Sequence, residues 1–332
     1  MPPHAIKARP LAKGCDMSEI TKGVVALVSA CTIWGLSPLF YKALSAVAPT
    51  EVLAHRTVWS MVLFAGVLLV QSRLSELWHA VTTFASLRVI AFAACMISVN
   101  WFLFIWAIQV GRATESSLGY YIFPLVAVVI GRLVFGEKLT RAQGISVALA
   151  CAAVLTLVVG LSIVPWVSLV LAVTFGFYGL VKKRLDMGPV ASVTAEVLVL
   201  SPIAVAWLVY LHTGPGGVFG RDVLNSGLLI AAGPMTALPL ILFSYGARRL
   251  AMATVGIVQY VNPTLQFLCA VVIFGEPFGP VHLIAFTLIW IALALYSVSA
   301  LRQDKARRKA EMVSDADVVV STKSSRDASA NP

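Results

Sequence analysis

Long apolar runs alternate with short polar segments along most of this chain. Each run is close to the ~20 residues that an α-helix needs to cross the hydrocarbon layer of a membrane. Because that layer offers the backbone no hydrogen-bond partners, helices are the expected form of these runs. We therefore predict ten membrane-spanning helices, at residues 22–44, 50–71, 88–109, 114–135, 140–160, 164–182, 190–212, 225–246, 253–274 and 279–301.

Polar segments flank these spans at both ends of the chain. Residues 1–20 are basic and contain proline, and residues 303–332 are charged and then rich in Ser and Asp. Segments of this composition bury too little apolar surface to fold alone. We predict two disordered tails.

The composition excludes a soluble protein. Of the 332 residues, 59% are hydrophobic and only 12% are charged, whereas soluble domains carry about 25% charged residues. A core of ordinary size cannot hide so much apolar surface. The net charge of +10 arises mainly from residues in loops and tails, not from the basic face that nucleic-acid binding needs. We expect an all-α membrane protein with membrane lipid around it and no nucleic-acid partner.

Loops rich in Lys and Arg alternate with loops that nearly lack them. Eighteen basic residues lie in the first tail, in every second loop and just after the last span, namely Lys7, Arg9, Lys13, Lys22, Arg73, Arg88, Lys138, Arg141, Lys182, Lys183, Arg184, Arg248, Arg249, Arg302, Lys305, Arg307, Arg308 and Lys309. The other loops hold only three, namely Lys42, Arg112 and Arg221. Basic residues collect on the cytoplasmic side of membrane proteins. We predict that both termini face the cytoplasm.

The two halves of the chain share an internal repeat. At a shift of 139 residues, identical residues include Phe104 with Phe243, Tyr121 with Tyr260, Pro124 with Pro263, Phe135 with Phe274, Gly136 with Gly275 and Glu137 with Glu276. At slightly longer shifts, Gly35 meets Gly176, and Glu51-Val52-Leu53 recurs as Glu196-Val197-Leu198. The predicted repeats are residues 21–161 and 162–302, with five spans each. Because five is odd, the second repeat enters the membrane from the opposite side.

Inverted repeats are typical of secondary transporters, which bind their substrate near the membrane midplane where the repeats meet. Gene duplication without transport is the alternative. The chain has no G-x-x-x-x-G-K-[ST] motif that would bind ATP phosphates. It also has no H-E-x-x-H or G-x-S-x-G motif. We expect neither enzymatic activity, nor a metal site, nor a cofactor.

The densest cluster of ionisable residues inside a span is Glu51, His55 and Arg56. Glu51 and His55 are four residues apart and share a helix face. Ionisable groups inside a membrane are costly and often functional, so the three are candidates for substrate recognition or proton coupling. An ion pair at a helix N-terminus is the alternative. Glu196, which matches Glu51, has no His or Arg beside it.

Polar and helix-breaking residues single out further spans. Asn100 and Trp101 lie in the middle of the third span, and the eighth span carries Gly233, Pro234 and Pro239. An Asn at this depth either bonds a neighbouring helix or lines a cavity. Irregular backbone inside the membrane is likewise tolerated where it packs within the protein or lines a cavity. We expect these two spans to be cavity walls.

The fourth and ninth spans carry matched aromatic residues and prolines. The candidates for the substrate cavity are Tyr120, Tyr121, Gln259, Tyr260 and Asn262, with Trp101 as a further aromatic wall. The candidates for hinges or gates are Gly35, Pro38, Pro124, Gly176, Gly233, Pro234, Pro239 and Pro263. Each group has a structural alternative. The prolines can form a kinked interface between helices, and the glycines can allow close helix packing. The aromatic residues can anchor the protein at the membrane interface.

Six blocks of sequence resemble the EamA family of the drug/metabolite transporter superfamily, and within it the RarD proteins. They are EVLAHRTVWS (51–60), VNWFLFIWAI (99–108), ESSLGYYIFPLV (115–126), TALPLILF (236–243), VQYVNPTLQFLCAVVIFGEP (258–277) and FTLIWIALAL (286–295). The resemblance covers residues 18–302. It implies two EamA repeats, a bacterial cytoplasmic membrane, and alternating access through a central cavity. The superfamily exports metabolites, amino acids and drugs, and RarD proteins are associated with chloramphenicol sensitivity.

The sequence thus predicts a secondary transporter of a small organic metabolite or drug, with protons as a candidate coupling ion. A membrane-embedded enzyme acting on lipid is one alternative, but it would need a second carboxylate near Glu51. A signalling or scaffold protein that uses its tails is the other. The sequence does not indicate an oligomeric state.

Overall fold

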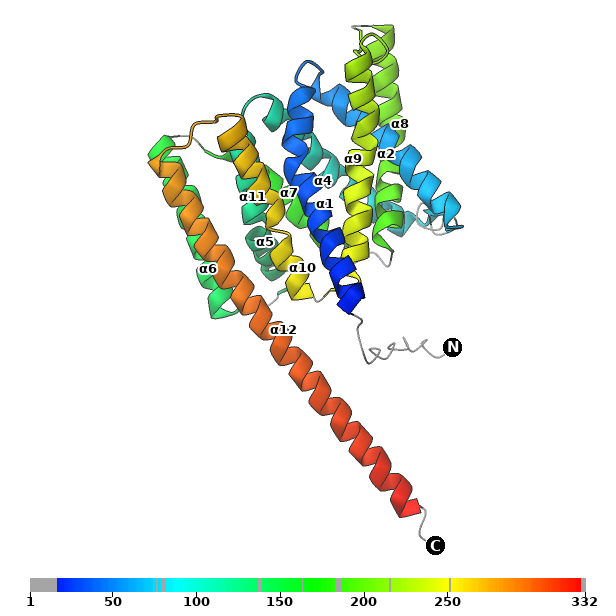
Figure 1. Ribbon diagram of the computed structural model, residues 1–332, viewed down its shortest axis with the longest axis vertical. Coiled ribbons are helices and arrows are strands. Elements are labelled where there is room, and N and C mark those ends of the chain that lie inside the picture. Colours follow the sequence, from blue (N-terminus) through cyan, green and yellow to red (C-terminus); the bar gives the residue numbers. More distant parts are fainter. Residues whose placement is uncertain are drawn as a thin grey trace.

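The computed structural model describes residues 17–329 except 74, 76, 79–81, 137–138, 163, 183–186, 215 and 251, so the first predicted tail lies almost wholly outside the described residues. Its regular elements, in order and shown in Figure 1, are all helical: α1 (Met17–Ala43), α2 (Pro49–Val70), α4 (Phe84–Gln109), α5 (Ala113–Phe135), α6 (Arg141–Leu161), α7 (Trp166–Lys182), α8 (Pro189–Thr213), α9 (Val223–Ala247), α10 (Met252–Val258), α11 (Val261–Leu268), the π-helix η1 (Cys269–Ile273) and α12 (Pro280–Ser329).

The all-α fold with ten spans in two inverted repeats is confirmed. Within the described residues, nine helical segments are long and apolar enough to cross a membrane. The tenth span is α7, which is apolar but has 17 residues. At 1.5 Å per residue it measures about 26 Å, slightly less than the ~30 Å hydrocarbon layer.

The ninth span is not one continuous helix. It consists of α10, α11 and η1, with a break at Gln259 and Tyr260. Pro263 lies four residues after Gln259, and a proline ring clashes with the carbonyl of the residue four positions earlier. Its match in the first repeat, Pro124, lies inside the unbroken helix α5. Matched prolines therefore have different backbone surroundings in the two repeats.

The last helix differs from the sequence prediction. α12 continues to Ser329 and projects beyond the bundle (Figure 1), where we predicted a disordered tail after residue 302. Residues 301–312 consist mostly of Leu, Arg, Lys, Gln, Ala, Glu and Met, which have high helix propensity. Composition pointed to disorder because the segment is too polar to bury, but local propensity favours a helix.

Packing runs between the two repeats. α1 of the first repeat packs against α9 and α11 of the second repeat. Its equivalent in the second repeat, α7, packs in the same way against α4 and α5 of the first repeat. α2 packs against α9 and α8 against α4, while α2 with α8, α5 with α11 and α6 with α12 are pairs of equivalent helices. The two repeats are thus interlocked about a pseudo-two-fold axis, and neither forms a separate bundle.

Glycines set the closest of these contacts. A Cβ at Gly35 of α1 would lie 2.7 Å from Leu265 Cβ of α11, and one at Gly176 of α7 would lie 2.9 Å from Ile130 Cδ1 of α5. A Cβ at Gly233 of α9 would lie 2.7 Å from the backbone of Trp59 in α2. Without side chains at these positions the helices approach closely, which is how membrane helices gain packing energy.

Several candidate hinge prolines lie in continuous helices. Pro38 in α1, and Pro234 and Pro239 in α9, interrupt neither helix. Pro38 cannot donate to the Trp34 carbonyl, and the Ser37 hydroxyl donates to that carbonyl instead, at 2.7 Å. A side-chain donor of this kind is what allows a proline inside a membrane helix.

Two glycines of α9 test the packing between repeats. Gly233→Ala forces a methyl group into the Trp59 backbone, whereas Gly227→Ala meets nothing within 4 Å. Overpacking of this kind costs ~1–3 kcal/mol. We expect Gly233→Ala to lower the thermal unfolding midpoint in detergent, and Gly227→Ala to leave it unchanged or raise it. Equal midpoints for the two variants would contradict the packing.

Candidate functional site

Glu51 anchors a loop. Its Oε1 accepts hydrogen bonds from the backbone N–H groups of Val218, at 2.8 Å, and Phe219, at 3.3 Å. These residues belong to the connection between α8 and α9, so a carboxylate of the first repeat holds a loop of the second. A buried backbone donor needs such a partner. The geometry favours a structural use of this carboxylate.

His55 lies one turn further along α2 and is buried. Its ring is 4.6 Å from that of Phe219, and its Nε2 has no hydrogen-bond partner within the described residues. Glu51 and His55 thus both meet the α8–α9 loop, but no ion pair between them is present in the described part of the chain.

Arg56 faces the interior of the bundle. Its Nε donates to Thr236 Oγ1 of α9 at 2.8 Å, and its guanidinium carbon lies 4.0 Å from the ring centre of Trp101 in α4. The Tyr41 ring of α1 is 5.7 Å away. Three predicted cavity or gate elements, α2, α4 and α9, therefore meet at this arginine.

Asn100 is engaged in a network between helices. Its Nδ2 donates to the Leu171 carbonyl at 2.9 Å and to Thr174 Oγ1 at 3.1 Å, both in α7, while Tyr120 of α5 donates to its Oδ1 at 2.8 Å. Asn100 is fully buried. With its amide occupied in this way, Asn100 joins α4, α5 and α7. The geometry therefore favours bonding between helices over the lining of a cavity.

A buried network in the second repeat was missed by sequence reasoning. Lys182 of α7 forms an ion pair with Glu196 of α8, and Tyr178 donates to Glu196 Oε2 at 3.0 Å. Ser192 lies between Lys182 and Glu196 and bonds both. Glu196 was considered only as the match of Glu51, and Lys182 only as a loop charge. The signal was available, because a carboxylate in a span requires a partner.

One end of the bundle is tied together across the repeats. We call it the α1–α2 end, because α1 ends and α2 begins there; it lies at the top of Figure 1. Glu276 accepts hydrogen bonds from the backbone N–H groups of Ala113, at 2.6 Å, and Thr114, at 2.7 Å, at the start of α5. A carboxylate suits the positive end of a helix dipole. Glu137, which matches Glu276, lies outside the described residues.

Two further contacts reinforce this end. Ser168 of α7 donates to the Glu115 carbonyl of α5 at 2.6 Å. Gln109 of α4 donates to the carbonyls of Leu44, at 2.9 Å, and Val47, at 3.2 Å, in the α1–α2 connection. Together with the Glu51 and Glu276 contacts, these bonds close the α1–α2 end with main-chain and side-chain groups from both repeats.

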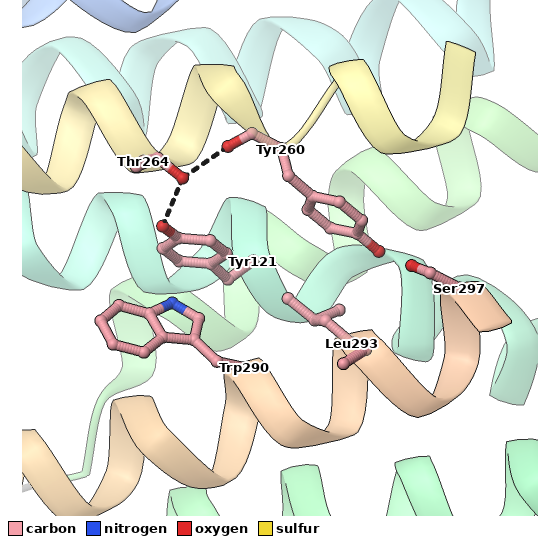
Figure 2. A pocket seen from close by; sticks show the side chains of 7 residues that line it. Tyr121, Tyr260, Thr264, Trp290, Leu293 and Ser297 are labelled. Atoms are coloured by element: carbon pink, nitrogen blue, oxygen red, sulfur yellow. Dashed lines mark hydrogen bonds between the residues drawn. The ribbon is translucent and has the colours of Figure 1, made fainter. Parts of the chain in front are cut away.

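Tyr121 and Tyr260 share a pocket of about 310 Å³ between α5, α11 and α12, which Figure 2 shows. The Tyr121 hydroxyl lies 2.8 Å from Thr264 Oγ1, which in turn donates to the Tyr260 carbonyl at 2.7 Å. Trp290 of α12 lies beside Tyr121, and the Tyr260 hydroxyl points toward Ser297 (Figure 2). The lining is mainly aromatic and aliphatic.

The candidate residues thus fall into separate places. Tyr121 and Tyr260 meet at the α12 pocket, Trp101 lies against Arg56, and Tyr120 belongs to the Asn100 network. Of the polar candidates beside Pro263, Asn262 Oδ1 accepts from Gln266 Nε2 at 2.8 Å. Gln259 lies at the break between α10 and α11.

Known proteins resemble this chain along most of its length. The model of the EamA-like transporter family matches residues 21–159 and again residues 162–298. The protein RarD of Streptomyces exfoliatus is 39% identical over 306 residues, which are 92% of this chain and 97% of that protein. An uncharacterized transporter of Vibrio cholerae is 38% identical over 296 residues, or 89% and 98% of the two chains.

Two further matches extend the comparison. The chloramphenicol-sensitive protein RarD of Pseudomonas aeruginosa is 33% identical over 297 residues, covering 86% of this chain and 98% of its own. A crystal structure superposes with a TM-score of 0.57 at 18% identity, covering 84% of this chain and 98% of the other. At that identity the superposition concerns the fold alone.

Substitutions at Glu51 test its use as a loop anchor. Glu51→Ala removes the acceptor of two backbone N–H groups, and hydrogen bonds to a charged group contribute ~1.5–3 kcal/mol. Glu51→Gln keeps an oxygen at the same place. We expect the alanine variant to lower the unfolding midpoint and to make the α8–α9 loop more sensitive to protease than the glutamine variant does. Equal protease sensitivity in both variants would contradict the anchoring contact.

Substitutions at Lys182 and Glu196 test the ion pair between them. Lys182→Met leaves a buried carboxylate without its cation, and breaking a buried ion pair in this way costs up to ~3–5 kcal/mol. We expect this variant to unfold at a lower temperature, and the double variant Lys182→Met/Glu196→Gln to regain most of the loss. A double variant less stable than both single variants would rule out the pairing.

Proposed function

Because this chain belongs to the EamA-like transporter family, we propose that it is a secondary transporter that moves a small organic solute by alternating access. It is a multi-pass membrane protein whose two repeats are interlocked. Alternating access is a rocking of one repeat or bundle against the other around a central site. Inverted repeats with the substrate site at their interface are one architecture that supports such a motion.

The observation that carries this proposal is the interlocking of the two inverted repeats, which side-chain bonds join at both ends of the bundle. At the α1–α2 end, Glu276 binds the start of α5, Glu51 binds the α8–α9 loop, and Ser168 binds α5, each across the two repeats. The repeats are related by inversion, so identical packing at both ends would give a symmetric molecule. At the opposite end, Arg249 pairs with Glu19 across the repeats at 3.0 Å, so different residues join the repeats at the two ends.

The distribution of basic residues supports an orientation. The α1–α2 end carries the connections that hold Lys42, Arg112 and Arg221, while the other end carries the loops rich in Lys and Arg. By the positive-inside rule the α1–α2 end faces outward. Both termini then lie in the cytoplasm of a bacterial cell, and the Glu51 and Glu276 contacts lie on the outer side.

The proposed substrate route follows from the candidate residues. Arg56, Trp101 and Thr236 lie where α2, α4 and α9 meet, and Thr236 is next to the midpoint of α9. This is the depth at which transporters of inverted-repeat type bind their substrates. The Pro263 break in the ninth span and the close contacts at Gly35 and Gly176 are the proposed hinges. His55, whose Nε2 has no hydrogen-bond partner within the described residues, is the proposed group for proton coupling, and Glu51 links its helix to the α8–α9 loop.

Reconstitution of the whole chain in proteoliposomes tests transport directly. A panel of labelled metabolites and drugs, with chloramphenicol included because one relative is named for sensitivity to it, is measured with and without a pH gradient. We expect saturable flux of at least one small organic solute. A pH gradient that drives uphill accumulation would identify protons as the coupling ion. No flux of any compound would contradict the transport proposal.

A variant at the α1–α2 end tests alternating access. Glu276→Ala removes two bonds to the start of α5, and at ~1.5–3 kcal/mol for bonds to a charged group it shifts the balance between the two states. We expect a change in flux of about tenfold or more with normal insertion. Asp222→Ala, which removes only a cap of α9 at the same end, serves as the matched control. Equal flux in both variants would contradict a gating use of Glu276.

A further inference from the structure

We propose that Arg56 binds the carboxylate of the transported solute, and that this solute is a monoanionic organic acid with an apolar or aromatic body. The inference rests on the proposed transport function and specifies its substrate class. It follows from one buried side chain whose charge has no ion-pair partner among the described residues.

Arg56 is the only Lys or Arg among the described residues that is buried, with 6% of its surface exposed. No carboxylate oxygen lies within 4 Å of its guanidinium nitrogens in the part of the chain that the structure describes. An arginine cannot release its proton in a protein. The charge is therefore permanent, inside a membrane, and without an ion-pair partner.

The contacts that Arg56 does make are neutral. Nε donates to the Thr236 hydroxyl, and the ring of Trp101 lies under the guanidinium. An aromatic face attracts a cation but accepts no in-plane hydrogen bond from the fork. Within the described residues, the two Nη groups have no hydrogen-bond acceptor. These two groups are the donors that would bind a ligand.

Neighbouring charged residues are occupied elsewhere. Glu51, five positions earlier on α2, binds the Val218 and Phe219 amides. Glu196 is held by Lys182 and Tyr178. The match of Arg56 in the second repeat, at the shift that pairs Glu51 with Glu196, is Ser201. The site therefore carries a single positive charge that the pseudo-two-fold symmetry does not duplicate.

The shape of the free donors selects the ligand chemistry. Two Nη groups side by side present parallel N–H bonds, which match the two oxygens of a carboxylate. A single positive charge neutralises a monoanion, whereas a phosphate dianion would retain an unpaired negative charge in the membrane. Trp101 packs with Phe64, Val197 and Ala237, and these side chains suit an apolar body better than a sugar.

Two helices hold the Arg56 guanidinium in place. Thr236 and Trp101 hold the guanidinium in one plane from two different helices, α9 and α4. A carboxylate bound to the two Nη groups would pair with the Arg56 charge at the junction of α2, α4 and α9. Because α2 belongs to the same repeat as α4 and to the opposite repeat from α9, substrate binding would connect both repeats.

The test begins with the unmodified chain in detergent and needs no substitution. Pairs of compounds differ only in their charged group: benzoate and benzamide, phenylacetate and phenylacetamide, with phenyl phosphate and benzylamine as further probes. We expect the carboxylates to raise the thermal unfolding midpoint in a saturable manner, with apparent affinities at least tenfold above those of the amides. Equal effects of acid and amide, no effect of any carboxylate, or a stronger effect of phenyl phosphate would overturn the proposal.

Variants then locate the effect at Arg56. Arg56→Gln should abolish the preference for the carboxylate, and Arg56→Lys should weaken carboxylate binding about tenfold because the fork is lost. Arg112→Gln, at an arginine already paired with Glu115, is the matched control and should keep wild-type binding. A retained acid preference in Arg56→Gln would overturn the assignment.

Flux in proteoliposomes separates this inference from the proposed function. If carboxylates are transported by the wild type and Arg56→Gln abolishes that transport, both the transport function and the substrate class are supported. Flux of neutral compounds alone, equal in the wild type and Arg56→Gln, overturns the substrate class but leaves transport intact. Carboxylate binding that depends on Arg56 without flux of any compound supports the site and contradicts transport.

Discussion

The packing of each repeat against the other is the constraint on which the rest of this structure depends. In a membrane, apolar side chains gain nothing by leaving lipid for one another, so helices associate through close contact and hydrogen bonds. Gly35, Gly176 and Gly233 provide that close contact at three junctions between the repeats. Since α1, α2 and their equivalents find their partners in the opposite repeat, neither half has a complete interior alone.

Some of the buried polar side chains serve this interlocking. Asn100 joins α4 and α5 to α7 of the other repeat, and Glu276 caps a helix of the other repeat, while Glu196 closes a network with Lys182 inside the second repeat. A polar group in lipid is costly unless it is bonded, and each of these is bonded. Arg56 is different, because its bonds to other described residues leave its charge without an ion-pair partner and its two Nη groups without an acceptor. That contrast, more than the mere presence of an arginine, singles it out.

The two repeats match in sequence but differ in local form. Pro124 and Pro263 correspond, yet α5 is continuous and the ninth span is broken and ends in a π-helix. Glu51 and Glu196 correspond, yet one holds a loop and the other pairs with a lysine. Two inverted copies of one sequence can therefore occupy different local conformations in the same molecule.

The pattern of apolar runs and basic loops determined the ten spans, the two repeats and their inversion, because hydrophobic length and charge are properties of short segments. Family blocks in both halves were also visible. Which polar residues are free was decided only by the tertiary structure. Glu51, His55 and Arg56 look equivalent along the chain, but the α8–α9 loop binds Glu51 and packs on His55, while Arg56 meets α9 and α4. Residues distant in sequence supply those partners, and no local pattern records them.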